Sequence, residues 1–286
     1  MLAVRNTLLA SAARVLARAR GRHTSWNAAM HAVKYDKALP IEADARREVC
    51  EFFGVSEQEL QALEVRHGRF STREFQLHVY RLFEGQTDND KALFGAYADA
   101  AFYYSLMLGL GCPRYATLFP FLDHLLAQFK RLGRRPVAVD YGSGTGDTAL
   151  LLSAHGFDVH LVDLPGRMNE FAQWRLRRRG FQPHWVPVTA DNPYPALPNP
   201  TDLVVTIEVW EHLRDPVAAL RNINAVTAPG RAYLMNTNQG FDYAVEGDHL
   251  AEGIARGRSP DYEQLYSQNW QPLSIDAPDG RLYVRK

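Results

Sequence analysis

The sequence has almost no cysteine and no surplus of charge of either sign. Its 286 residues contain 2 Cys, and 32 Lys plus Arg balance 32 Asp plus Glu. Cys50 and Cys112 fit neither a disulfide framework nor a cysteine-based zinc site. The balanced charge provides no overall basic field for a polyanion, which disfavours a general nucleic-acid binder. With 46% hydrophobic and 22% charged residues, the chain is typical of a globular protein, which we expect to be cytoplasmic.

The chain also lacks a hydrophobic run that would span a bilayer comfortably. The longest apolar stretch, residues 95–111, is interrupted by Asp99, so we expect a buried helix there. The first 35 residues contain no acidic residue, and their apolar positions recur at helical spacing. We expect residues 1–24 to form a basic surface helix. Membrane-surface contact and an organelle transit peptide are the alternatives that we do not favour.

Residues 1–130 show no strand-like alternation and predict a helical region. Ser56 with Glu59, and Ser71 with Glu74, have the spacing of a capping box, in which two side chains satisfy free amides of the first helical turn. We therefore expect helices to begin directly after Ser56 and after Ser71.

Residues 131–286 alternate short β-rich runs with helical patterns, which indicates a parallel sheet built from βαβ units. The expected strands cover residues 137–141, 157–163, 183–188, 202–207 and 231–236, and two more flank a Pro-Asp-Gly turn within 270–286. The expected helices cover residues 147–155, 167–179, 215–226 and 246–256. The sequence thus predicts an α/β fold whose mostly parallel sheet ends in an antiparallel hairpin, preceded by the helical region.

Three alternating glycines follow the first expected strand directly. Gly142, Gly144 and Gly146 lack a Cβ, so the backbone can take positive φ and a ligand can approach the amides of the next helix. The spacing is G-x-G-x-G, whereas a dinucleotide fingerprint requires G-x-G-x-x-G. Asp163 ends the next expected strand, where a carboxylate can accept both hydroxyls of a ribose. Together these features predict a nucleoside-containing ligand at the carboxyl edge of the sheet.

The segments VAVDYGSGTG, VHLVD, VTAD, TDLVVTIEVWEHLRDP and APGRAYLMN resemble the ordered motifs of class I S-adenosylmethionine-dependent methyltransferases, in the small-molecule group that includes the ubiquinone-biosynthesis type. The resemblance covers residues 136–238 and implies a Rossmann-like, seven-stranded sheet with helices on both faces. It also implies S-adenosyl-L-methionine as cofactor. A proline-rich run at 192–195 departs from the family pattern, at the place of the usual short helix.

The resemblance assigns roles to individual positions. Gly142, Gly144 and Gly146 would pass the methionine part of the cofactor, and Asp140 would hold the turn and the amino group. Asp163 would bind the ribose and Asp191 the adenine amino group. Glu208 would face the methyl donor. In such enzymes the helical region before the cofactor domain builds the lid and the acceptor pocket. Its aromatic residues suggest an apolar or aromatic-walled pocket, although core packing would use them too.

Methyl transfer from a sulfonium needs an aligned acceptor and the exclusion of water, and an oxygen or carbon acceptor must also lose a proton. The candidate bases are Glu208, His212, His249, Asp248, Tyr103, Tyr104 and His124. We take His249, His212 and Glu208 as the candidate catalytic residues; the alternative for His212 is an orienting or packing role, and for the two tyrosines a place in the core. Glu211 with His212, and Asp248 with His249, are adjacent pairs whose side chains do not face each other on a helix, so we expect no metal.

Residues 167–180 carry five arginines and one glutamate. We expect a solvated helix face there; the alternative is a surface for an anionic acceptor or a partner.

The sequence predicts in-line methyl transfer to a small-molecule acceptor, and it leaves O-, N- and C-methylation open. A nicotinamide-dependent oxidoreductase is the first alternative, which the glycine spacing and the terminal hairpin disfavour. A non-catalytic module that binds the cofactor or a partner is the second. The sequence indicates no nucleic-acid partner and leaves the oligomeric state open.

Overall fold

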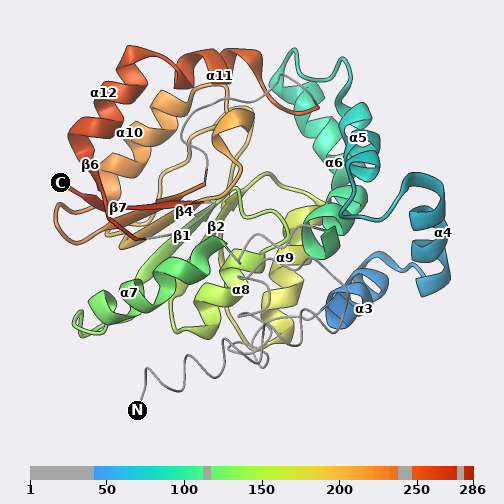
Figure 1. The fold of residues 1–286 in the computed structure, drawn as a ribbon, viewed down its shortest axis with the longest axis horizontal. Coiled ribbons are helices and arrows are strands. Elements are labelled where there is room, and N and C mark those ends of the chain that lie inside the picture. Colours follow the sequence, from blue (N-terminus) through green and yellow to red (C-terminus); the bar gives the residue numbers. More distant parts are fainter. Residues whose placement is uncertain (1–41, 112–116, 238–246, 276–279) are drawn as a thin grey trace.

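The computed structural model describes residues 42–111, 117–237, 247–275 and 280–286 (Figure 1). The predicted surface helix over residues 1–24 lies outside these ranges, as does Cys112. Within the described ranges, no helix has the length and apolar character needed to cross a membrane.

A single sheet organises the second half of the chain. Among the described residues it contains seven strands in the order β3-β2-β1-β4-β5-β7-β6 (Figure 1). The strands are β1 (Val137–Tyr141), β2 (Asp158–Asp163), β3 (His184–Pro187), β4 (Leu203–Thr206), β5 (Tyr233–Asn236), β6 (Trp270–Pro272) and β7 (Arg281–Arg285). Strands β1 to β5 pair in parallel, whereas β7 runs antiparallel to both β5 and β6. This confirms the predicted mostly parallel sheet with its reversed strand.

Helices cover both faces of this sheet (Figure 1). They are α7 (Phe119–Phe129), α8 (Asp147–Ala154), α9 (Arg167–Arg178), α10 (Pro216–Val226), α11 (Ala251–Gly257) and α12 (Pro260–Asn269), with a short 3-10 turn η4 (Trp210–His212). Helices α7, α8 and α9 bury their apolar side chains against one face, and α10, α11 and α12 against the other. Because successive strand residues point to opposite faces, Ala138 joins the first core and Val139 the second. Helix α7 precedes residue 130 yet packs on the sheet.

The remaining helices form a separate layer with its own core. They are α3 (Glu42–Phe53), α4 (Glu57–His67), α5 (Arg73–Tyr80), the short turn η1 (Arg81–Phe83), α6 (Asp90–Leu106) and a π-helical turn η2 (Met107–Gly111). The apolar stretch predicted to be a buried helix forms most of α6 and all of η2. Phe171 of α9 and Leu250 join this core, which attaches the layer to the sheet domain.

One of the two predicted helix starts is correct and the other is displaced. Ser56 and Glu59 form the reciprocal capping box at the start of α4. Ser71, however, is not the cap of α5. Thr72 has the extended backbone of a cap residue, and its side chain accepts a hydrogen bond from the Phe75 amide. The helix therefore begins one residue later than predicted, because threonine is also a good capping residue.

Arg167, Arg177 and Arg178 are exposed, as expected for a solvated helix face, but Arg175 of α9 is buried. Arg175 is 1% exposed; its Nε donates to Glu48 at 3.0 Å, and its Nη1 lies 2.8 Å from a carboxylate oxygen of Asp147. Nη1 also donates to the carbonyl of Thr145, inside the glycine-rich turn, at 2.7 Å. Glu48 lies on α3 and Asp147 on α8. Arg175 therefore connects the helical layer, α9 and the turn after β1.

We predict that Arg175→Gln destabilises the protein by about 3–5 kcal/mol, because it leaves the buried carboxylate of Asp147 without its cation and that of Glu48 with Arg179 alone. Arg177→Gln on the same helix is the matched control. Its side chain is exposed, and we expect a change within about 0.5 kcal/mol. Urea unfolding of both variants measures the difference. Equal stability of the two variants would show that the buried cluster contributes little.

Candidate active site

The carboxyl ends of β1, β2 and β4 border a cavity of about 480 Å³. This volume lies within the range of about 300–1,000 Å³ that is usual for small-molecule sites. The sheet side of its wall includes Gly142, Gly144, Asp163 and Glu208. Residues of α6 and η2 form part of the opposite wall. The cavity thus lies between the sheet domain and the helical layer.

The turn after β1 requires glycine at the positions that border the cavity. Gly142 has a φ of +72°, and a Cβ there would lie 2.5 Å from a methyl carbon of Val209. Gly144 has a φ of +52°, and a Cβ there would lie 3.3 Å from Leu108 of η2. Both values lie in the region that only glycine adopts readily. The turn can therefore bring its backbone close to a ligand.

Asp163 joins the end of β2 to this turn. One of its carboxylate oxygens accepts a hydrogen bond from the Gly144 amide at 2.5 Å and another from Ser143 Oγ at 3.3 Å. The other oxygen accepts from the Leu164 amide at 2.7 Å. Asp163 is therefore held at the cavity wall, and a carboxylate in that place can accept hydrogen bonds from hydroxyl groups.

Three residues that the resemblance assigns to the cofactor do not line the cavity. Asp140 is 3% exposed within β1. Gly146 precedes α8, where a Cβ would lie 2.9 Å from Ala172 of α9. Asp191 is exposed in the turn after β3. The described residues between β3 and β4 form no helix, in keeping with their proline-rich sequence.

Glu208 lines the cavity with an unusual backbone. Among the described non-glycine residues it alone has a positive φ, +53°. Its amide donates to Thr237 Oγ1 at 3.0 Å, and its carboxylate accepts a hydrogen bond from the same hydroxyl at 3.1 Å. Such a conformation costs on the order of 1–3 kcal/mol and is commonly retained where it positions a functional side chain.

A buried carboxylate connects α6 to the cavity wall. Asp248 is 1% exposed, and its Oδ2 accepts hydrogen bonds from the hydroxyls of Tyr97 and Tyr104, the latter at 2.6 Å. The same oxygen lies 3.1 Å from Nδ1 of His212. Burial by itself raises the pKa of Asp248, but the neighbouring His212 and the three hydrogen bonds hold that pKa below its usual value.

Tyr97 is not among the candidate bases that the sequence suggests, although it is one of the aromatic residues expected to wall the acceptor pocket. A signal for it exists, because Tyr97 and Tyr104 are seven residues apart and so lie on one face of α6. Burial and the Asp248 carboxylate raise the pKa of Tyr97 well above its usual value, which keeps its hydroxyl protonated as a donor. The two tyrosines thus fix the position of Asp248 behind His212.

Of the three predicted catalytic residues, His212 and Glu208 line the cavity and His249 does not. The His249 ring is buried, with its centroid 5.0 Å from that of His212. Glu211 is 1% exposed, and neither of its carboxylate oxygens has a hydrogen-bond partner within the described part of the chain. One ligand atom each of Glu211, His212 and His249 lies within 4.8 Å of the others. The tertiary structure therefore brings Glu211, His212 and His249 together, although neighbouring side chains on a helix were not expected to face one another.

The arginines at the cavity wall are paired with acids. Arg214 contacts the carboxylates of Asp90 and Glu252, and its Nη2 donates to a backbone carbonyl at 2.8 Å. Arg256 contacts the carboxylate of Asp215. Because Asp90 begins α6 and Glu252 lies in α11, these pairs fasten the helical layer across the cavity.

Residues 114–273, more than half of the chain, match the family model described as a methyltransferase domain. The chain belongs to this methyltransferase family. It is 31% identical over 178 residues to a ubiquinone biosynthesis O-methyltransferase of Caulobacter sp. (strain K31), a match that covers 56% of this chain and 71% of that protein. It is 29% identical over 164 residues to a tRNA 5-carboxymethoxyuridine methyltransferase of Escherichia coli (strain K12), covering 52% and 61%. That second match spans less than two thirds of the relative.

Among solved structures, that of the mitomycin 7-O-methyltransferase matches with 18% identity and a TM-score of 0.48, covering 96% of this chain and 87% of that one. The present chain, as a member of the methyltransferase family, uses S-adenosylmethionine as its cofactor. The cavity fits this group: a turn without Cβ atoms lies beside a carboxylate at the end of β2, and the volume suits a nucleoside-sized ligand.

We predict that Glu211→Gln stabilises the methyltransferase at neutral pH. Burial raises the pKa of the Glu211 carboxyl, so the folded state favours its protonated form. The stability that this provides is complete below the ordinary carboxyl pKa of about 4.3 and is lost as the pH rises through the higher pKa of the folded state. The gain in Tm from Glu211→Gln should therefore shrink as the pH is lowered.

Thermal unfolding of Glu211→Gln at neutral and mildly acidic pH measures this effect, and Glu84→Gln at an exposed position is the control. A lower Tm of Glu211→Gln at neutral pH would mean that the native carboxylate is ionised and stabilised by a cation.

Proposed function

We propose that the methyltransferase transfers the methyl group to a hydroxyl oxygen of a small, largely apolar molecule, with His212 as the base that takes the hydroxyl proton. The observation that carries the proposal is the position of His212 at the cavity wall, with the carboxylate of Asp248 3.1 Å behind it. This paired arrangement orients an imidazole for proton transfer.

The contact with Asp248 decides which nitrogen of His212 acts. A buried carboxylate beside Nδ1 favours the tautomer with the proton on Nδ1, so that Nε2 carries the lone pair. Nε2 lies 3.7 Å from the nearer carboxyl oxygen of Glu211. A base of this kind serves an acceptor that must lose a proton, which favours a neutral hydroxyl over an ionised carboxylate.

The remaining wall supports an apolar acceptor. Leu93, Phe94, Leu108, Met168 and Leu250 border the cavity on the side of the helical layer. Side chains of this kind exclude water and bind an apolar or aromatic group by burial. The sequence-based expectation of an acceptor pocket in the helical region supports the same assignment.

Nucleic acid is the less favoured acceptor, although one relative is a tRNA methyltransferase by name. Binding of a polyanion draws on basic groups that can reach phosphates. The two arginines at the cavity wall, Arg214 and Arg256, are engaged with acidic side chains, and the whole chain has no net charge. These features favour a small molecule.

For the cofactor, we propose that the amides of the glycine turn face its methionine part and that Asp163 binds the ribose hydroxyls. Asp140 and Gly146 shape the turn from outside the cavity, Glu208 faces the methyl donor, and the adenine contact of Asp191 stays a prediction. When bound, the cofactor supplies an activated methyl group on a sulfonium. The protein then has to align the acceptor, exclude water and take the proton.

Asp163→Asn should weaken cofactor binding by about tenfold or more, because a neutral amide replaces the carboxylate that accepts charge-assisted hydrogen bonds. Calorimetric titration with S-adenosylmethionine and S-adenosylhomocysteine measures the loss. Asp261→Asn, at an exposed position on α12, is the control. Unchanged affinity of Asp163→Asn would contradict the ribose assignment.

Activity is tested by release of S-adenosylhomocysteine with a panel of phenols that carry apolar substituents; carboxylic acids and bulk tRNA are the competing acceptors. Turnover of the phenols supports the proposal, and turnover of tRNA alone overturns it.

With an active phenol, His212→Gln should lower kcat by about 10²–10⁴-fold and leave cofactor affinity unchanged. His249→Gln should lower kcat less, because its ring does not line the cavity. A larger loss of kcat for His249→Gln than for His212→Gln would identify His249 as the base instead of His212.

A further inference from the structure

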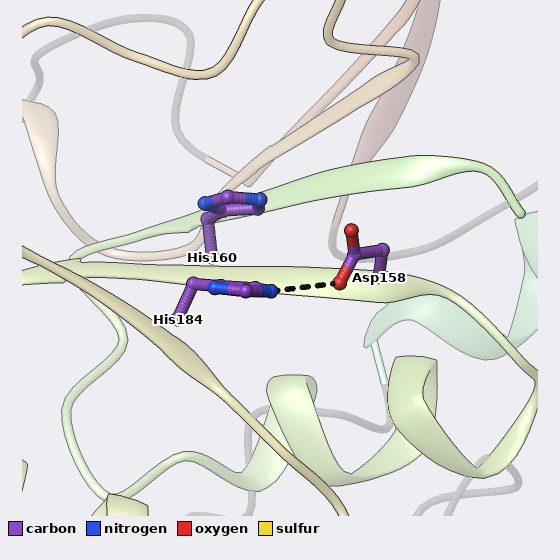
Figure 2. Close-up of side chains that lie close together, drawn as sticks. All are labelled: Asp158, His160 and His184. Atoms are coloured by element: carbon purple, nitrogen blue, oxygen red, sulfur yellow. Dashed lines mark ion pairs between the residues drawn. The ribbon is translucent and has the colours of Figure 1, made fainter.

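A second group of metal-ligating side chains lies on the sheet, away from the cavity. Figure 2 shows Asp158, His160 and His184 on neighbouring strands, with one ion pair drawn between His184 and Asp158. One ligand atom from each residue lies within 4.8 Å of the other two. None of the three lines the cofactor cavity.

Strand geometry places these three side chains together. Asp158 and His160 are two residues apart on β2 and therefore point to the same face of the sheet. His184 is the register partner of His160 on the parallel edge strand β3. The two imidazole rings stack with centroids 4.5 Å apart and an angle of 18° between their planes. Nε2 of His184 lies 3.2 Å from Asp158 Oδ1.

The open space above these strands has a structural cause. The described residues between β3 and β4 form no helix, and the buried residues of the core on this face include Val162 of β2 but none of β3. As a result the His184 side chain is 56% exposed and that of Asp158 35% exposed. A solvated ion can therefore reach His184 and Asp158, while His160 is partly buried against the His184 ring.

We propose that Asp158, His160 and His184 bind a divalent transition-metal ion of the zinc class, which connects the edge strand β3 to β2. Two imidazole nitrogens and one carboxylate oxygen are ligands that such ions prefer, whereas Mg²⁺ and Ca²⁺ prefer oxygen alone. Metal–nitrogen bonds of about 2.0–2.1 Å require ligand atoms closer together than 4.8 Å, so binding of an ion requires these side chains to rotate. Water completes the coordination.

This site is independent of the cofactor site. His160 lies three residues before Asp163 on β2, which separates their Cα atoms by about 10 Å. A metal ion at this place holds the two strands together below the carboxyl edge and takes no part in methyl transfer. Its binding therefore stands or falls separately from the proposed function.

The test is a calorimetric titration of the full chain, without a polyhistidine tag, with Zn²⁺ in excess Mg²⁺. His160→Gln with His184→Gln should remove one bound equivalent. His67→Gln with His78→Gln is the matched control, because those rings also stack, at 3.8 Å, but the described residues place them in no such ligand group. Glu211, His212 and His249 stay intact in both variants, so an ion bound there is counted equally.

Asp158→Asn provides a milder variant that preserves both rings. It should weaken Zn²⁺ binding by about 10–100-fold or more, because loss of even an outer-shell partner typically costs that much. Circular dichroism checks that each variant is folded. Equal numbers of Zn²⁺ ions bound by the wild type and by the folded double variant would overturn the proposal and leave only an ion pair beside a stacked histidine pair.

Discussion

The parallel pairing of β1 with β2 and with β4 is the constraint on which the site depends. It brings the carboxyl ends of three strands to one edge, so that the glycine turn, Asp163 and Glu208 border the same cavity. A strand end alone would leave these groups to solvent. The Gly144 amide and the Asp163 carboxylate instead hold each other in place.

The opposite wall depends on how firmly the helical layer is attached. Arg175 attaches the helical layer to the sheet domain by binding Glu48 and Asp147. At the cavity, Arg214 pairs with Asp90 of the helical layer and with Glu252 of α11. Compared with well-packed apolar residues, a buried cation between two acids adds little net stability, but the loss of one partner is costly because it leaves a buried charge unpaired. The same layer supplies the tyrosines that hold Asp248 behind His212.

Sequence patterns predicted much of the fold, and they singled out Gly142, Gly144, Asp163 and Glu208, which border the cavity, because such patterns follow local rules. Periodicity located the strands β1 to β5, and the glycine spacing disfavoured a dinucleotide-binding turn. Other helices or helix starts were not predicted correctly, although the sequence contains a local signal for them. Helix α12 begins with Ser259 as cap and Pro260 in its first turn, yet it is not among the helices predicted from the sequence. At α5 the cap is Thr72 instead of Ser71, since both neighbours are chemically able to cap.

The sequence by itself determined the order of strands along the chain, the glycine turn and the carboxylate that follows it, because these depend on spacing between near neighbours. The tertiary structure alone decided that Arg175 is buried, that Tyr97 reaches Asp248, and that Asp158 and His160 meet His184. Each of these contacts joins residues that are distant in sequence, and their geometry depends on strand order and helix packing. A helical or strand pattern gives the face of a side chain but not the element that it meets.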